Sequence, residues 1–112
     1  DKRKLFSQEH LQKNPSYGYI EYPLIALNQF RKMNKEIIKD LKKVTCPTLI
    51  IHSKSDVTSI EENVDLIYKN ISSKDKKKLI VDKSSHHLFV DEIDKDVIYH
   101  KVLTFINKHC NV

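Results

Sequence analysis

Two polar segments of this chain carry residue types that can take up and release a proton. Asp56 follows a run of apolar residues at 48–52, and His86 and His87 follow a second run at 78–82. If both runs are parallel strands, their carboxyl ends lie at the same edge of a sheet, where open α/β sheets bind ligands. A carboxylate that hydrogen-bonds to an imidazole holds it in one tautomer and stabilises its protonated form. The pattern therefore predicts an acid–base pair made by Asp56 and one of the two histidines.

Both runs have the features of strands in a parallel sheet. Residues 48–52 are continuously apolar rather than alternating, which is typical of parallel strands that are covered on both faces. Pro47 stops any preceding helix. Two strands that alternate with helices imply a parallel sheet with a right-handed crossover. The predicted fold class is therefore α/β.

Helices are predicted on either side of the second strand, because apolar residues recur there at helical spacing. The first helix begins near Ser59, which has the Ser-x-x-Glu spacing of a capping box with Glu62. The second runs from about residue 94 to residue 108. The predicted inner faces are Val64, Ile67, Tyr68 and Ile71 in the first helix, and Val97, Ile98, Val102, Phe105 and Ile106 in the second.

The predicted sheet is incomplete. Two parallel strands cannot bury both faces of such apolar runs by themselves, and no further strand of this kind is predicted. The chain also begins at Asp1 rather than at Met. We therefore expect a fragment of a larger α/β domain, with an exposed sheet edge that favours self-association.

The first part of the chain is predicted to be helical with one turn. Residues 7–13 form a short helix, and the only glycine, Gly18, marks a turn at residues 17–19. Pro23 suits the first turn of a helix. A long amphipathic helix with a lysine-rich outer face is expected over residues 24–43, with Leu27, Phe30, Ile37, Ile38 and Leu41 at helical spacing.

The composition is that of a soluble globular protein and excludes several function classes. The net charge is +5, but the densest lysine cluster, residues 74–78, contains no aromatic residue and matches no nucleic-acid motif. We predict a solvated turn there and no nucleic-acid partner. No apolar run approaches the roughly 20 residues that a membrane span requires.

The cysteines and the remaining histidines predict no metal site. Cys46 and Cys110 lack metal-type spacing and are expected to be reduced thiols of a cytoplasmic protein, with Cys46 buried at the entry to the first strand. Metal-ligand spacing is also absent among His10, His52, His100 and His109. We therefore predict neither a metal nor a cofactor.

Two segments resemble those that deliver the acid and the histidine of a catalytic triad in α/β-hydrolases. They are residues 46–56, which end at Asp56, and residues 78–86, which end at His86. The resemblance is closest to bacterial carboxylesterases and monoacylglycerol lipases. Nucleophile, acid and histidine follow one another along the chain in this fold, and Asp56 precedes His86 as that order requires. The resemblance implies that Asp56 is the triad acid and that His86, rather than His87, is the general base.

The same resemblance implies where the chain lies in the fold. It covers roughly residues 22–108 and makes the chain the C-terminal part of an α/β-hydrolase, with the last two parallel strands and their flanking helices. Residues 1–22 are then the end of a cap region or a linker, and residues 23–112 are the C-terminal α/β segment. In the cap region, the residues that either line an acyl pocket or pack are Tyr17, Tyr19, Ile20 and Tyr22.

The chain departs from the family pattern in two loops and lacks a nucleophile. Ser53 and Ser85 stand where the family usually has glycine. A Gly-x-Ser-x-Gly elbow needs two glycines, and the sequence contains one. The resemblance therefore implies a parent serine hydrolase of carboxylic esters, with the chain inactive alone. Its small-molecule substrates are short- or medium-chain acyl esters, monoacylglycerols or lysophospholipids.

Two alternatives to an esterase remain open. The chain is a non-catalytic fragment or a partner-binding domain from a truncated or split gene, or it serves another α/β-hydrolase chemistry, such as that of a peptidase or a dehalogenase. Fold analogy cannot separate these alternatives, because function resides in the site. A Gly-x-Ser-x-Gly motif in the upstream coding sequence favours the esterase, whereas a stop codon or an unrelated domain there excludes it.

Overall fold

The structure is a computed structural model that describes residues 23–90 and 92–110. The predictions for residues 1–22, namely the short helix, the turn, the pocket-lining tyrosines and the cap region or linker, lie outside the described residues. The chain divides into two units, residues 1–39 and residues 40–112, and each is described by itself. The predicted domain boundary between residues 22 and 23 stays a prediction.

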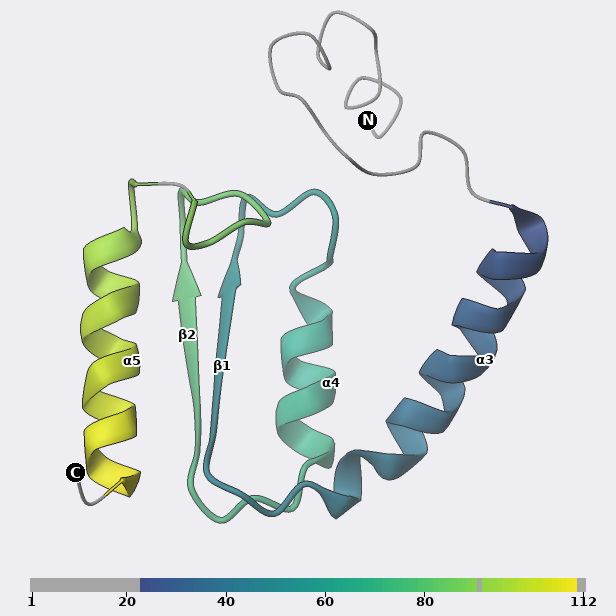
Figure 1. Ribbon diagram of the computed structural model, residues 1–112, viewed down its shortest axis with the longest axis horizontal. Helices are drawn as coiled ribbons and strands as arrows, with labels where there is room; N and C mark the ends of the chain where they lie inside the picture. Colours follow the sequence, from purple (N-terminus) through teal and green to yellow (C-terminus); the bar gives the residue numbers. More distant parts are fainter. Residues whose placement is uncertain (1–22, 91, 111–112) are drawn as a thin grey trace, which may run out of the picture. The chain divides into compact units, whose positions relative to one another are not determined.

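The long helix expected over residues 24–43 is present. α3 spans Leu24–Asp40, and the chain continues as a 3-10 turn, η1, at Leu41–Lys43 (Figure 1). The carbonyl of Pro23 accepts a hydrogen bond of 3.1 Å from the N–H of Leu27. Proline has no backbone N–H group. Its position at the helix start costs no hydrogen bond, because the first N–H groups of a helix have no partner within it.

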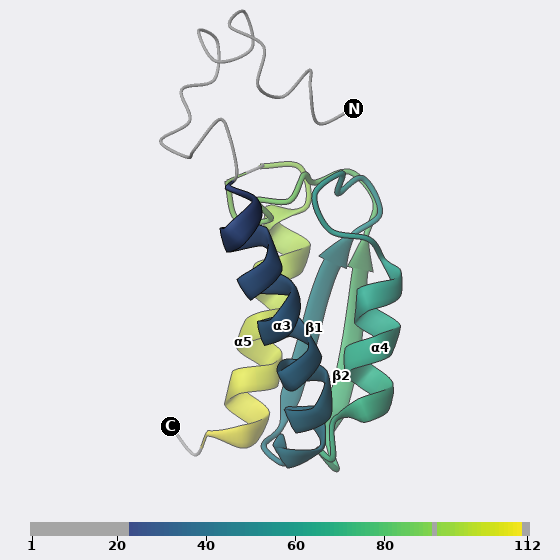
Figure 2. The same cartoon turned by 90° about the vertical axis from the view of Figure 1, so that its right-hand side faces the viewer.

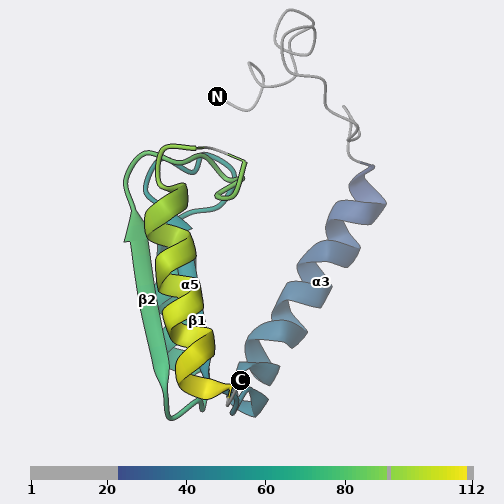
Figure 3. The same ribbon diagram turned by 60° about the vertical axis from the view of Figure 1, so that its left-hand side comes forward.

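The second unit holds a parallel pair of strands, β1 at Thr48–Ser53 and β2 at Lys76–Val81. α4, at Glu62–Asn70, joins the strands, and α5, at Lys95–His109, follows β2. The two helices cover opposite faces of the pair, with both strands between them in Figure 2. Figure 3 looks onto the face that α5 covers. The predicted α/β class is confirmed.

The second strand begins earlier than the sequence predicted. It spans Lys76–Val81 instead of residues 78–82, so part of the lysine cluster expected in a turn belongs to the sheet. The reason is a contact of Lys76, whose Nζ donates hydrogen bonds to the carbonyls of Tyr68 and Ile71 at 2.7 and 3.0 Å. A lysine at the C-terminus of α4 satisfies carbonyls that the helix leaves unpaired and complements its dipole.

α4 begins at Glu62, and the capping box predicted for Ser59 is absent. The N-cap is Glu61, whose side chain makes no capping hydrogen bond. The Ser59 hydroxyl instead accepts a hydrogen bond of 3.1 Å from Nδ2 of Asn63, and the Ser59 N–H donates to Asp56. The prediction was wrong because Asp56, which the spacing rule does not consider, organises the loop before the helix.

The core of the second unit is small. Among the described residues, the buried apolar side chains are Val64, Ile71, Val81 and Ile98. Four more residues of the predicted inner faces are half-buried, namely Ile67, Tyr68, Val102 and Phe105. Val97 and Ile106 were also predicted to face inward, but they are 57% and 45% exposed. They flank the stripe centred on Ile98, and a pair of strands is too narrow to cover the edges of that helix face.

β1 has β2 as its one strand neighbour within the described part of the chain. Most β1 side chains are only half-buried, although the strand is mainly apolar. Both observations agree with the prediction that these strands come from a larger sheet. Unpaired strand edges promote association between chains, and self-association of this chain stays a prediction.

Ile98→Ala tests whether this small core stabilises the second unit. We expect the free energy of unfolding to fall by about 2–5 kcal/mol, because the substitution leaves a cavity where a fully buried side chain was. The matched control is Val97→Ala. It should change the free energy of unfolding by no more than about 0.5 kcal/mol, because exposed side chains contribute little to stability. Chemical denaturation measures both variants, and equal losses would contradict this assignment of the core.

Candidate active site

The polar loops that follow β1 and β2 are tied to each other where they leave the sheet. The register pairs Ser53 with Val81, so both strands end at the same level. The N–H of Lys54 donates to the carbonyl of Val81 at 2.9 Å, and Oγ of Ser55 donates to the carbonyl of Asp82 at 2.6 Å. An exposed ion pair of 3.2 Å also joins Lys54 and Asp82. The two hydrogen bonds set the spacing of the loops that carry Asp56 and His86, whereas an exposed ion pair contributes little.

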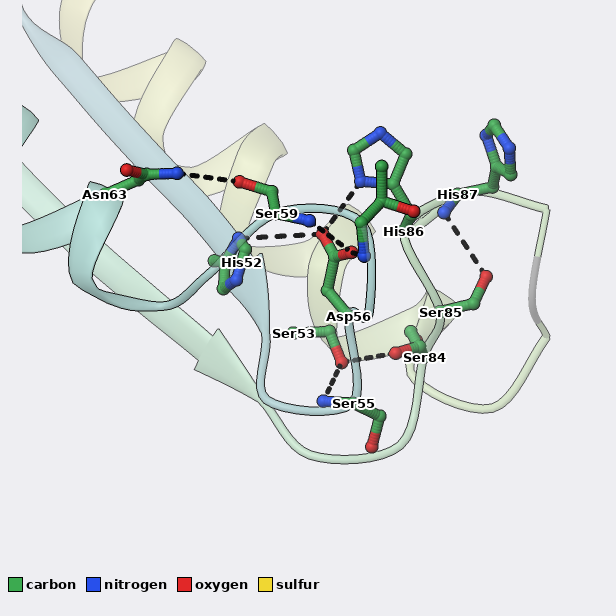
Figure 4. A network of polar contacts seen from close by, with 11 residues as sticks. His52, Ser53, Ser55, Asp56, Ser59, Asn63, Ser84, Ser85, His86 and His87 are labelled. Atoms are coloured by element: carbon green, nitrogen blue, oxygen red, sulfur yellow. Dashed lines mark hydrogen bonds and ion pairs between the residues drawn. The ribbon is translucent and has the colours of Figure 1, made fainter. Parts of the chain in front are cut away.

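Asp56 and His86, which the sequence predicts as a pair, are hydrogen-bonded in the structure. Oδ2 of Asp56 lies 2.8 Å from Nδ1 of His86. The Asp56 side chain is 4% exposed, whereas the His86 side chain is 46% exposed. Figure 4 shows that the second ring nitrogen of His86 points away from Asp56. The predicted hydrogen bond is therefore confirmed, and the catalytic roles of the two residues stay a prediction.

The other carboxylate oxygen of Asp56 organises the loop that carries it. Oδ1 accepts hydrogen bonds from the N–H groups of Thr58 and Ser59, at 2.7 and 3.0 Å. Aspartate side chains commonly close turns in this way. A turn residue and a catalytic acid are competing interpretations of a lone aspartate after a strand. In this structure one oxygen of Asp56 closes the turn and the other binds the imidazole.

The surroundings of Asp56 favour its ionised form. Burial acts to raise the pKa of the Asp56 carboxyl group, but the hydrogen bonds from His86, Ser59 and Thr58, together with the charge of His86, outweigh it. The pKa of Asp56 therefore lies below its ordinary value. An ionised carboxylate only accepts hydrogen bonds, so a neutral His86 must carry its proton on Nδ1. Nε2 is then the nitrogen that can act as a base.

The neighbouring histidine, His87, is not directed at Asp56. Its ring meets the His86 ring edge-on, with centroids 5.4 Å apart, and its backbone N–H donates to Oγ of Ser85 at 3.3 Å. Figure 4 shows the His87 ring on the side of His86 that is remote from Asp56. The choice of His86 over His87 as the partner of Asp56 is confirmed by the hydrogen bond.

His52 lies close to the pair, although its sequence context was interpreted only in terms of metal binding. Its Nδ1 is 4.0 Å from Oδ2 of Asp56, and its side chain is 11% exposed. Its Nε2 is buried and has no hydrogen-bond partner among residues 23–90 and 92–110. The available signal was its position near the end of β1, on the strand that leads directly to Asp56.

Two buried serines connect the loops from the inside. Ser53 and Ser84 are 1% and 0% exposed. Oγ of Ser53 donates a hydrogen bond to the carbonyl of Ser84 and accepts one of 3.2 Å from the N–H of Ser55. Ser53 therefore links the two loops in this chain. The role of Ser84 was not predictable from the sequence, because one contact between two loops leaves no periodic pattern.

The structure adds three observations on metals, membranes and thiols. Within residues 23–90 and 92–110, no three His, Cys, Asp or Glu side chains are grouped as metal ligands, and no helix is long and apolar enough to cross a bilayer. Cys46 and Cys110 are free thiols, and both are exposed. The predicted burial of Cys46 was wrong, because burial begins with β1 itself and residues 45–47 before it are exposed.

Comparisons with known proteins identify the family. A family model described as serine aminopeptidase, S33 matches residues 6–93, which is most of the chain. This chain belongs to that family of α/β-hydrolases. The resemblance drawn from the segments around Asp56 and His86 is therefore confirmed at the level of the family.

Three similar proteins have described activities. This hydrolase chain is 29% identical, over 100 residues, to the thermostable monoacylglycerol lipase of Bacillus sp. (strain H-257), and the match covers 87% of the chain and 40% of that lipase. A structure from work on the metagenome-derived lipolytic enzymes LipS and LipT matches with a TM-score of 0.70 and 34% identity, over 82% of this chain and 37% of that one. The structure of the monoacylglycerol lipase of Paleococcus ferrophilus matches with a TM-score of 0.64 and 17% identity. That match covers 72% of this chain and 31% of the lipase.

The structural matches confirm the α/β-hydrolase fold for this hydrolase segment. The segment spans about 40% of the length of the lipase that it matches in sequence. Its parallel strand pair and flanking helices are consistent with the C-terminal part of that fold.

Asp56→Asn should change how the stability of the protein depends on pH. The pKa of Asp56 is depressed in the folded state, so its stabilising contribution is present above the ordinary aspartate pKa of about 3.9 and is lost as the pH falls through the lower folded-state pKa. The difference in unfolding free energy between wild type and variant should therefore narrow as the pH falls from about 5 through the lower folded-state pKa. Urea denaturation at several pH values measures it, with the exposed Asp82→Asn as control. A difference that does not vary with pH would contradict the assigned pKa.

Proposed function

We propose that this chain supplies the acid and the histidine of a Ser-His-Asp triad in a serine hydrolase that cleaves carboxylic esters. The supporting observation is the 2.8 Å hydrogen bond between the buried carboxylate of Asp56 and Nδ1 of the half-exposed His86. A triad requires an acid that orients one ring nitrogen and a second ring nitrogen that can reach the nucleophile. The lipolytic relatives support an ester as the substrate.

In this proposal the nucleophile is a serine outside the 112 residues, since their single glycine cannot form a Gly-x-Ser-x-Gly elbow. The serine oxygen attacks the ester carbonyl while Nε2 of His86 takes the hydroxyl proton. The protonated His86 returns that proton to the leaving alcohol, and an acyl-serine remains. Water then attacks the acyl group with His86 as the base again. Asp56 stabilises the imidazolium in both steps.

The proposed substrates are small esters with an acyl chain. Short- or medium-chain acyl esters, monoacylglycerols and lysophospholipids share the bond that this chemistry breaks. Among them, a monoacylglycerol is favoured by the described activity of the relative from Bacillus sp., which matches most of this chain.

Aminopeptidase activity is a second candidate, because the family model that matches residues 6–93 is described as a serine aminopeptidase. The same triad serves amide and ester hydrolysis. Nitrophenyl esters and monoacylglycerols, compared with aminoacyl nitroanilides on the full-length protein, separate the two candidates. Turnover of the nitroanilides alone would contradict the esterase proposal.

The 112-residue chain by itself should not hydrolyse nitrophenyl esters. The reason is that it contains an acid and a base but no nucleophile elbow. A sensitive absorbance assay on purified chain measures this, with His86→Ala as the control for contaminating esterases. Turnover that survives purification and disappears in His86→Ala would contradict the absence of a nucleophile.

In the full-length hydrolase, Asp56→Asn should lower kcat by a factor on the order of 10⁴, as the corresponding change does in serine proteases, because the imidazole then adopts the wrong tautomer. His86→Ala should lower kcat at least as much. Asp82→Asn and His87→Ala are the matched controls, because Asp82 is an exposed carboxylate of the adjacent loop and His87 does not face Asp56. Steady-state kinetics on a nitrophenyl ester measures all four. If the Asp56→Asn enzyme keeps most of its activity and its melting curve is unchanged, Asp56 is a turn residue and not a catalytic acid.

A further inference from the structure

The carboxylate of Asp94 binds the loop that leads to His86. Its Oδ2 accepts hydrogen bonds from the N–H of Lys83 at 3.1 Å, the N–H of Ser84 at 2.8 Å and Oγ of Ser84 at 2.8 Å. Three donors on one oxygen stabilise its negative charge. The segment two residues before His86 is therefore attached to the start of α5.

Asp94 occupies a position where an aspartate normally serves its own helix. It is the N-cap of α5, and its carbonyl accepts the helical hydrogen bond from the N–H of Ile98 at 3.0 Å. N-cap aspartates usually bind the N–H groups of the first helical turn. The Asp94 side chain makes no such bond. The side chain binds another loop instead, although an N-cap hydrogen bond would stabilise the helix by roughly 1 kcal/mol.

The contact of Asp94 continues through Ser84 to the loop of the acid. The carbonyl of Ser84 accepts the hydrogen bond from Oγ of Ser53, and the carbonyl of Ser53 accepts one of 3.1 Å from the N–H of Asp56. Ser53 and Ser84 are both buried, so water does not compete for these bonds. Hydrogen bonds at Ser84 and Ser53, joined through the covalent structure of these two residues, therefore link Asp94 to the residue that binds His86.

α5 provides a firm support for this link. Ile98 lies one turn after Asp94 and is fully buried against the sheet. Asp94 thus links the polar segment before His86 to a packed helix. After His86 the loop also meets α5, where the Phe89 ring lies edge-on to that of Tyr99 with centroids 5.6 Å apart. Side chains after His86 in this loop, such as Phe89 and Val90, are 52% and 77% exposed.

We propose that Asp94 is a positioning residue for His86, which it holds in line with Asp56 through Ser84. The proposal rests on the proposed function, because alignment of His86 matters only if His86 is the base. A displacement of about 1 Å at a catalytic group can cost a factor on the order of 10² in rate. Loss of the Asp94 carboxylate releases the loop and permits such a displacement.

The test uses the full-length hydrolase with a nitrophenyl ester, with kcat expressed per active serine titrated by a fluorophosphonate. Asp94→Ala should lower kcat by about 10²-fold and leave KM within about twofold, because alignment is lost and substrate contacts remain. Asp94→Asn should lower kcat less, since its amide oxygen still accepts hydrogen bonds. Ser84→Ala should also lower kcat less than Asp94→Ala, since it retains the backbone N–H that donates to Asp94.

The matched control is Asp96→Ala, which removes a charge from the first turn of the same helix. It should leave kcat within about twofold of wild type, because helix-dipole effects amount to only about 0.3–1 kcal/mol of stability. Active-site titration removes the contribution of unfolded molecules. If Asp94→Ala does not fold, the kcat values of Asp94→Asn and Ser84→Ala test the proposal instead. Each of these variants nearly preserves the shape of the side chain that it replaces.

A double-mutant cycle separates positioning from a merely structural role. If Asp94 acts through the alignment of His86 on Asp56, Asp94→Ala should change kcat by less than about twofold in an Asp56→Asn background, since coupled residues are not additive. Equal losses in both backgrounds, or wild-type kcat in Asp94→Ala while His86→Ala is inactive, would overturn the role of Asp94 and leave the triad proposal intact. An active His86→Ala enzyme would instead overturn the proposed function.

Discussion

The arrangement of the site depends on how the carboxylate of Asp56 divides its two oxygens. Oδ1 accepts the N–H groups of Thr58 and Ser59 and closes the loop after β1, whereas Oδ2 accepts the hydrogen bond from His86 in the loop after β2. A buried carboxylate is costly unless its oxygens are hydrogen-bonded. The partners of Asp56 therefore stabilise the charge and, at the same time, fix which loops can approach it.

These loops meet because β1 and β2 are parallel and end at the same level. Contacts at the strand ends then hold the loops together, through Lys54 to Val81, Ser55 to Asp82 and Ser53 to Ser84. A single hydrogen bond of this kind contributes only about 1 kcal/mol to stability. Their number matters more, because several bonds between two short loops leave the imidazole few alternative positions relative to the acid.

Several features of the second unit agree with a segment that spans less than half the length of its relatives. β1 is mainly apolar yet half-buried, and α5 exposes apolar side chains on both flanks of its buried stripe. Nε2 of His52 is buried without a hydrogen-bond partner in the described part of the chain. Buried polar atoms in complete domains almost always have a partner. Nε2 of His52 is therefore an exception to this rule among the residues that the structure describes.

Local patterns along the chain were sufficient for the order of strands and helices and for a pair made by Asp56 and one of two histidines, whereas the choice of His86 came from the family resemblance. Apolar runs followed by polar loops, and apolar residues at helical spacing, are properties of short segments and are therefore visible in the sequence itself. The start of β2 and the N-terminus of α4 were mispredicted, because Lys76 binds carbonyls of α4 and Ser59 binds Asp56 rather than its own helix. The link from Ser53 to Ser84 and the contact of Asp94 were not predictable from spacing. They join loops that are close only after the parallel strands have paired, so no periodic signal in the sequence records them.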